Sequence, residues 1–231
     1  MTTFNIKVVS DAICPWCYLG KVRLEKAISI YQKTVPGGDK DSFKISWHPF
    51  YLDPALPKTP VDNKTHLANK FGPGRAAMIM ARLQSMGAAE GLNFTMEGKV
   101  GNTRDAHRLV QLAKTKSNEL ENKVILELFK SYFEQGGDIT SLDMLTSAGE
   151  RAGLDKSEVR KWLEDGKGGD AVDREVEEAY RKGISGVPNF TINDRYDLSG
   201  AQEPETFVAE FLRAKQSALG VSTTSSEGMT C

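Results

Sequence analysis

The sequence predicts an α/β fold in which one sheet is built from the two ends of the chain and is interrupted by a large helical insertion. Three observations predict this. A strand–helix–strand pattern covers residues 4–52, residues 63–183 are almost entirely helical in pattern, and residues 187–212 return to two strands and a helix. A single sheet formed by the βαβ and ββα segments is the simplest way to pack elements in this order.

The first segment begins with residues 4–9, which alternate and are rich in β-branched side chains, as strands are. After Ser10 and Asp11, apolar residues at helical spacing continue as far as the Pro-Gly-Gly-Asp sequence at 36–39. Residues 43–52 predict a second strand. A strand, a helix and a strand in this order form a βαβ unit, which has a right-handed crossover.

The middle segment follows a stiff connection that contains three prolines. Its apolar residues recur at every fourth position over 120–132 and 172–184, as in amphipathic helices. Thr140 and Asp155, each followed three residues later by an acidic residue, resemble capping boxes at helix starts. The methionines of this segment are expected to fill the core. One side of the helix predicted over 76–86 carries Met78, Ile79, Leu83 and Met86.

The last segment predicts a hairpin, with strands at 187–192 and 196–199 on either side of an Asn-Asp turn. Pro204 lies near the first turn of a final helix. From residue 220 onward the sequence is rich in serine, threonine and glycine, which is typical of a disordered tail.

These patterns divide the chain into three parts. A discontinuous sheet domain comprises residues 1–61 and 184–219, an inserted helical domain comprises residues 62–183, and a flexible tail comprises residues 220–231. The insertion is expected to cover one end of the sheet and to wall a groove above the first cysteine.

Composition excludes several classes of function. A net charge of −1 gives no support for binding nucleic acid or an anionic membrane. The N-terminal residues lack the pattern of a secretory signal, and the longest apolar run, residues 76–81, is too short to cross a bilayer. Three cysteines are too few for a disulfide framework. We therefore expect a cytoplasmic protein, in which a close pair of cysteines is catalytic or metal-binding.

Residues 14–17, Cys-Pro-Trp-Cys, put two cysteines one helical turn apart at the start of the first predicted helix. A disulfide requires Cα atoms within about 7 Å, and residues three apart on a helix meet this condition. Pro15 suits the first helical position. Cys14 would then lie at the helix N-terminus, which favours a thiolate, and thiol pKa values in such motifs fall to about 3.5–7. We expect Cys14 to attack a substrate and Cys17 to resolve the mixed disulfide.

Two other interpretations compete with this redox chemistry. A structural zinc site needs four ligands, usually with a second close pair. The remaining candidates are isolated in the sequence: Cys231, His48, His66 and His107. Two inert buried thiols are the other alternative, although Pro-Trp between them would be unusual packing at a strand-to-helix turn. We expect no metal, a structural role for His107, and an incidental thiol at Cys231.

Four motifs together resemble the DsbA-like thioredoxin superfamily, in particular its FrnE-type branch. They are SDAICPWCYLGK at 10–21, NTRDAHRL at 102–109, GVPNF at 186–190 and LSGAQEPETF at 198–207. The resemblance covers about residues 4–215 and implies a thioredoxin fold with a helical insertion, with dithiol–disulfide exchange through Cys14 and Cys17. It also implies that Pro188 is a cis-proline facing the disulfide. From the sequence alone, a proline that starts an edge strand is the simpler interpretation.

A related branch contains an isomerase and the kappa-class glutathione transferases, and its members bind glutathione on the same scaffold. This chain resembles that branch at Asn102-Thr103 and Val187-Pro188. In that branch, however, a serine replaces Cys14 and an Asp-Arg type pair replaces Ala201-Gln202, which weakens the glutathione-transfer interpretation. Glutathione stays a candidate redox partner that would pair with the backbone of Val187. No cofactor is expected to be obligatory.

The leading hypothesis is a thiol–disulfide oxidoreductase, acting as a monomer or homodimer on a thiol or disulfide substrate that is either a protein or a small molecule. The alternatives are a glutathione-dependent isomerase or transferase, a natural-product tailoring enzyme, and a non-catalytic binding module. The intact Cys14 and Cys17 favour the first.

Overall fold

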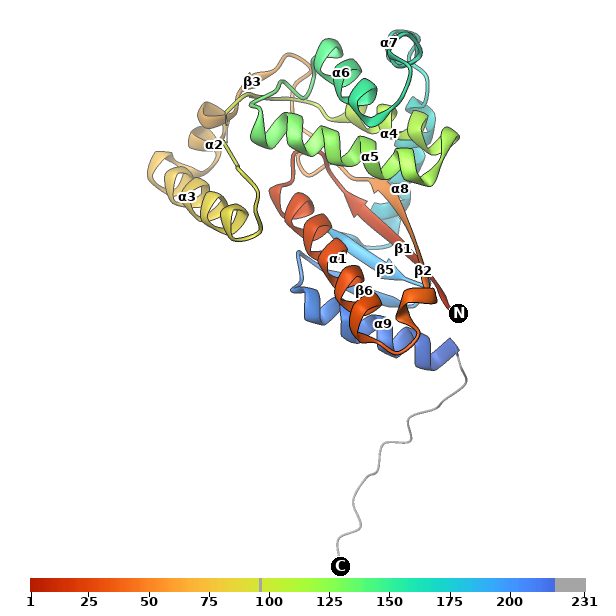
Figure 1. The fold of residues 1–231 in the computed structure, drawn as a ribbon. Coiled ribbons are helices and arrows are strands. Elements are labelled where there is room, and N and C mark those ends of the chain that lie inside the picture. Colours follow the sequence, from red (N-terminus) through yellow and green to blue (C-terminus); the bar gives the residue numbers. More distant parts are fainter. Residues whose placement is uncertain (96, 219–231) are drawn as a thin grey trace, which may run out of the picture.

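A four-stranded sheet with the strand order β2-β1-β5-β6 lies between the helical insertion and α9 (Figure 1). The computed structural model describes residues 1–95 and 97–218. The central strand of the sheet, β1, is parallel to β2 and antiparallel to β5. Strand β5 in turn pairs antiparallel with β6. The strands are β1 Thr3–Ser10, β2 Ser42–Pro49, β5 Asn189–Ile192 and β6 Tyr196–Ser199.

Two long helices, α1 Pro15–Thr34 and α9 Pro204–Ala218, lie side by side against this sheet (Figure 1). A short 3₁₀ helix, Gly38–Lys40, follows α1. An aromatic cluster joins the three elements, because the rings of Phe4 on β1, Tyr31 on α1 and Phe211 on α9 lie 5.3–5.7 Å apart. Both chain ends therefore contribute to one apolar layer, which holds the C-terminal part of α1 through Tyr31.

The helical insertion lies between β2 and β5 in the sequence. The α2–α3 hairpin projects to one side of it and is reached through the short pair β3–β4, whereas α5 and α8 contact β2 (Figure 1). Its elements are β3 Val61–Asp62, α2 Asn63–Phe71, α3 Pro73–Ala89, β4 Lys99–Val100, α4 Arg104–Lys116, α5 Asn118–Phe129, the π-helical turn Lys130–Glu134, α6 Leu142–Ala152, α7 Lys156–Glu164 and α8 Gly169–Arg181.

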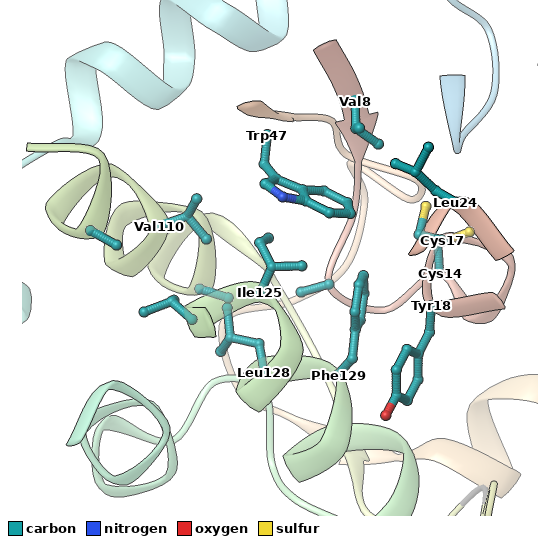
Figure 2. Close-up of a cluster of buried hydrophobic side chains, with 14 of the residues drawn as sticks. Val8, Cys14, Cys17, Tyr18, Leu24, Trp47, Val110, Ile125, Leu128 and Phe129 are labelled. Atoms are coloured by element: carbon teal, nitrogen blue, oxygen red, sulfur yellow. The ribbon is translucent and has the colours of Figure 1, made fainter. Parts of the chain in front are cut away.

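The insertion and the sheet share one hydrophobic core. Trp47 on β2 is buried against Phe129 of α5, with ring centroids 6.4 Å apart (Figure 2). Polar contacts fix the same junction, since the Trp47 backbone N–H donates to Glu121 at 2.6 Å and its indole N–H donates to Asn122 at 2.8 Å. The insertion is thus packed on the sheet, next to the start of α1.

The predicted α/β class, with βαβ and ββα ends around a helical insertion, is confirmed. The Asp155 cap is also confirmed, because its carboxylate accepts from the Glu158 N–H at 2.8 Å. The Thr140 cap is wrong by one residue: Ser141 caps α6 and accepts from the Met144 N–H at 3.3 Å. The two-residue strand β4 interrupts the segment 63–183 that was predicted to be helical, and it pairs with β3, which lies just before that segment.

The predicted division into domains stays a prediction, since the sheet and the insertion share a core. The tail predicted at 220–231 lies outside the described residues.

Candidate functional site

Cys14 is the N-cap residue of α1, and Pro15 opens the helix. The backbone of Cys14 is extended, with φ −90° and ψ 110°, and its N–H donates to the Asp11 carbonyl at 3.1 Å. The Cys17 N–H in turn donates to the Cys14 carbonyl at 3.0 Å. The strand β1 therefore delivers Cys14 to the positive end of a twenty-residue helix, where negative charge is stabilised.

Cys17 lies one turn further along α1, and both cysteine side chains are buried, Cys17 at 0% and Cys14 at 1% exposure. Both are free thiols. Burial raises the pKa of the Cys17 thiol well above its ordinary value, and the adjacent Cys14 raises it further. The Ser10 hydroxyl and the Asp11 backbone oppose part of this increase. Both cysteines lie at the margin of the apolar cluster around Trp47 and Phe129 (Figure 2).

The loop before β5 faces Cys14. The Cys14 Sγ–H donates to the Val187 carbonyl at 3.5 Å, and the Val187–Pro188 peptide bond is cis, as the resemblance implied. Gly20 on α1 permits this close approach: a Cβ at that position would lie 3.1 Å from Pro188 Cγ and 3.0 Å from Phe190 Cζ. The predicted residues Cys14, Cys17, Val187 and Pro188 are thus brought together from the two ends of the chain.

A largely apolar groove of about 300 Å³ opens beside Cys14. We call it the Cys14 groove. The α2–α3 hairpin forms one wall, the π-helical turn contributes Tyr132 and Phe133, and Trp16 and Val187 border the cysteine. Its further lining residues are Ile13, Pro15, Leu52, Asp53, Leu56, Asn63, His66, Leu67, Lys70, Phe71, Ile79, Leu83 and Val100. The insertion therefore walls a groove next to Cys14, as predicted.

A second, larger pocket of about 690 Å³ also reaches Val187 and Pro188. It is bordered by charged and polar side chains of the sheet, among them Lys7, Asp194 and Asp197, and by the loop 182–186. Val187 therefore borders both the apolar groove on the Cys14 side and the polar pocket.

Polar groups are buried on the far side of Cys17. Among the described residues, neither Ser10 Oγ nor Asp11 Oδ1 has a hydrogen-bond partner. The other Asp11 oxygen, Oδ2, accepts from the Leu52 N–H at 2.8 Å. His107 on α4 is also buried; its Nε2 lies 3.1 Å from the Phe50 carbonyl oxygen and 3.4 Å from Asp11 Oδ1.

The other two histidines have acidic neighbours. His48 on β2 is held by Glu175 of α8, with Nδ1 and Oε2 2.7 Å apart, and His66 lines the Cys14 groove with its Nε2 4.0 Å from Asp53 Oδ2. Within 1–95 and 97–218, no group of three or more His, Cys, Asp or Glu side chains could hold a metal ion. Cys231 lies outside the described residues.

Sequence reasoning missed the groove residues of α2 and α3 and the buried group of Ser10 and Asp11. The only signal for the latter was the Ser-Asp pair directly before the cysteine motif. Nothing local indicated that the helix at 63–71 would lie beside Cys14.

Comparison with known proteins supports the resemblance. The model of the DSBA-like thioredoxin domain family matches residues 5–212. A probable DsbA oxidoreductase from Streptomyces coelicolor is 31% identical, with a TM-score of 0.78, over 97% of this chain and 94% of that one. The uncharacterized protein YwbO of Bacillus subtilis is 29% identical over 89% of this chain and 94% of its own length.

A more distant structure shares the fold alone. The cytosolic disulfide reductase DsbM from Pseudomonas aeruginosa, solved with GSH, is 17% identical, covers 92% of this chain and 99% of its own, and has a TM-score of 0.58. In the described part of this chain, no helix has the length and apolar character needed to cross a membrane.

Proposed function

Because the chain belongs to the DSBA-like thioredoxin domain family, we propose that it is a thiol–disulfide oxidoreductase that exchanges the Cys14–Cys17 dithiol with a thiol or disulfide substrate. One observation carries the proposal: Cys14 caps the N-terminus of α1 and lines a groove, whereas Cys17 lies one turn further along α1 and does not line it. This asymmetry suits a pair in which one sulfur meets the substrate and the other acts only on its neighbour.

In the reducing direction, the Cys14 thiolate attacks one sulfur of a substrate disulfide and releases the other as a thiolate. The helix N-terminus favours the attacking anion. Cys17 then attacks Cys14 Sγ, which forms the Cys14–Cys17 disulfide and releases the second thiolate. Burial favours the protonated form of Cys17 until this second step, because burial raises its pKa.

The volume and the lining of the Cys14 groove indicate which substrates could bind there. Its volume of about 300 Å³ is at the lower end for small-molecule sites, and its lining is mostly apolar. A cysteine flanked by apolar side chains, or a compact apolar disulfide, would fill it. We propose that both protein and small-molecule substrates of this kind are accepted.

Glutathione is the proposed redox partner, with no obligatory cofactor. The polar pocket of about 690 Å³ adjoins Val187 and carries both lysine and aspartate side chains, which suits the charged ends of glutathione. Its cysteinyl backbone would pair with Val187, while its sulfur reaches Cys14. The same pocket supports the second candidate function, a glutathione-dependent isomerase or transferase, or a natural-product tailoring enzyme, which would act on a small molecule in the Cys14 groove.

One experiment separates these functions. The purified protein should reduce a model disulfide with glutathione as electron donor, and Cys14→Ser should abolish the reaction. An isomerase or transferase would instead convert an apolar substrate with no net oxidation of glutathione. A binding module would do neither, and its two thiols would stay reduced in the presence of disulfide.

The compartment and the assembly stay predictions. A cytoplasmic location would be checked by cell fractionation, and the expected monomer or homodimer by sedimentation.

A further inference from the structure

The α2–α3 hairpin, which forms one wall of the Cys14 groove, carries basic side chains without acidic ones. Of the 30 basic and 31 acidic side chains in the chain, residues 63–89 contain four basic ones and no acidic one. The rest of the chain therefore has an excess of acidic side chains. The hairpin is a positively charged element of an otherwise negatively charged molecule, and its four cations are all exposed: Lys64, Lys70, Arg75 and Arg82.

The two arginines of α3 differ from the two lysines of α2 in their partners. Lys70 Nζ lies 2.5 Å from Asp53 Oδ2, and Lys64 also has a carboxylate within ion-pair distance. Within the part of the chain that the structure describes, neither Arg75 nor Arg82 has an acidic partner. The charges of these two arginines are therefore available to a binding partner.

Apolar side chains accompany the arginines at the surface. Phe71 ends α2 and lines the Cys14 groove, yet it is 38% exposed, and Met78 of α3 is exposed as well. The Arg75 guanidinium carbon lies 5.9 Å from the centroid of the Phe71 ring, and Lys70 Nζ lies 6.0 Å from it. The rim of the groove is thus an exposed aromatic ring next to two cations.

These side chains continue from the rim along α3. Met78 and Arg82 follow Arg75 by three and seven residues, so the three share one side of the helix. Ile79, which lines the groove, lies beside them on the same helix. We call Phe71, Arg75, Met78 and Arg82 the basic stripe. Seven residues of helix are about 10 Å long, so the stripe extends well beyond the groove.

We propose that the basic stripe docks an acidic segment of a protein substrate whose reacting sulfur enters the Cys14 groove. This inference rests on the proposed function and names its substrate class. Carboxylates of the segment pair with Arg75 and Arg82, because a guanidinium binds a carboxylate through two hydrogen bonds. Apolar side chains of the segment contact Phe71 and Met78.

The length of the stripe favours a polypeptide over a small molecule. A disulfide that fits a groove of about 300 Å³ would not also reach Arg82. An extended chain spans about 3.3 Å per residue, so about three residues cover the distance from Arg75 to Arg82. The acidic residues are thus expected within about six residues of the reacting cysteine.

Two peptides of equal length test the docking, each in a mixed disulfide with the coloured thiol thionitrobenzoate. One peptide carries aspartates within about six residues of its cysteine, and the other carries asparagines at the same positions. The release of coloured thiolate by the reduced protein gives a second-order rate constant for each peptide. The acidic peptide should react at least about fivefold faster at low salt, and the ratio should fall at high salt.

Variants of the stripe should change this ratio in a defined direction. Arg75→Gln combined with Arg82→Gln should remove most of the preference for the acidic peptide. Arg75→Glu combined with Arg82→Glu should reverse the preference in favour of a peptide with lysines at those positions, which a folding defect could not produce.

The matched control is Arg174→Gln combined with Arg181→Gln. These arginines are also seven residues apart on one helix, α8, and are exposed without an acidic partner among the described residues. Helix α8 lies away from α3 (Figure 1). The control removes the same charge from the molecule and should keep the preference for the acidic peptide.

Equal rates with both peptides, or a preference for the acidic peptide that survives Arg75→Glu with Arg82→Glu, would overturn the docking site and leave the proposed function intact. Binding to vesicles of phosphatidylcholine and phosphatidylserine that depends on Arg75 and Arg82, with no preference between the peptides, would assign the stripe to a membrane instead. A protein that releases no thiolate from either peptide would refute the proposed function itself, and this inference with it.

Discussion

On the Cys14 side of the α1 N-terminus, apolar side chains border a groove of about 300 Å³ that a substrate could enter. On the Cys17 side, buried polar groups border a cavity of about 10 Å³, which has room for no more than a water. The two sulfurs lie one helical turn apart but face different environments. The difference teaches that a symmetric sequence motif can be made asymmetric by the elements packed around it.

The largest expected effect comes from the cysteines themselves. Cys14→Ser should abolish disulfide exchange, because the sulfur that borders the groove is removed. Cys17→Ser should still react once and then accumulate a mixed disulfide that it cannot resolve. Mass spectrometry of the protein after incubation with a model disulfide would detect that adduct. An equal yield of adduct on Cys14→Ser would contradict the different roles assigned to the two cysteines.

The next largest effect concerns stability on the Cys17 side. Although burial opposes it, hydrogen bonds from His48 and Lys114 lower the pKa of Glu175 from 4.5 to about 2. A depressed pKa stabilises the folded protein above the unfolded value, and this stabilisation is lost as the pH falls toward the folded value. The unmodified protein should therefore lose up to about 3 kcal/mol of unfolding free energy from this group between about pH 4.5 and 2.

Glu175→Gln should remove that part of the pH dependence. Urea unfolding at several pH values would measure it as the difference between the two proteins. Parallel curves for the two proteins across this range would contradict the assigned role of Glu175.

A smaller effect is expected on the Cys14 side. Ile79→Glu places a charge in the Cys14 groove and should lower kcat/KM for an apolar aromatic disulfide about tenfold, since the charge must be desolvated when the substrate binds. The neighbouring Met78 is 68% exposed and does not line the groove, so Met78→Glu is the matched control. Steady-state kinetics that change equally in both variants would argue against the groove as the substrate site.

The smallest effect lies outside both regions. Ser141→Ala removes the cap of α6, which packs on α5 and α7, and should cost about 1 kcal/mol of unfolding free energy. It should leave the rate of disulfide exchange unchanged. Thermal unfolding and a disulfide-exchange assay together would check this, and an altered exchange rate would mean that the chemistry is not local to α1.

Much of the fold could be predicted from the sequence because its signals are local. The β-branched alternation of β1, the Cys-Pro-Trp-Cys sequence and the strand that follows Pro188 each depend on neighbouring residues. The approach of Val187 to Cys14 followed from the family resemblance, since it joins residues 173 positions apart.

The walls of the groove and cavity could not be predicted in this way. Periodicity put Met78 on the same side of α3 as Leu83, yet Met78 is 68% exposed and Leu83 is buried, because the apolar stripe of α3 is broad and only part of it faces the groove. His66 and Ile79 reach the groove through the packing of the α2–α3 hairpin. The contact of His107 with Asp11 likewise depends on how α4 packs against the end of β1.

The asymmetry of the two thiols is tested most directly by the pH dependence of their alkylation. Iodoacetamide would be added to Cys17→Ser, which retains Cys14, and to Cys14→Ser, which retains Cys17, over a range of pH. We expect the Cys14 thiol to react rapidly at about pH 6, because it caps a helix and borders the groove. The Cys17 thiol should react only at much higher pH, because burial raises its pKa. Two variants that react at the same rate, with the same dependence on pH, would contradict the account.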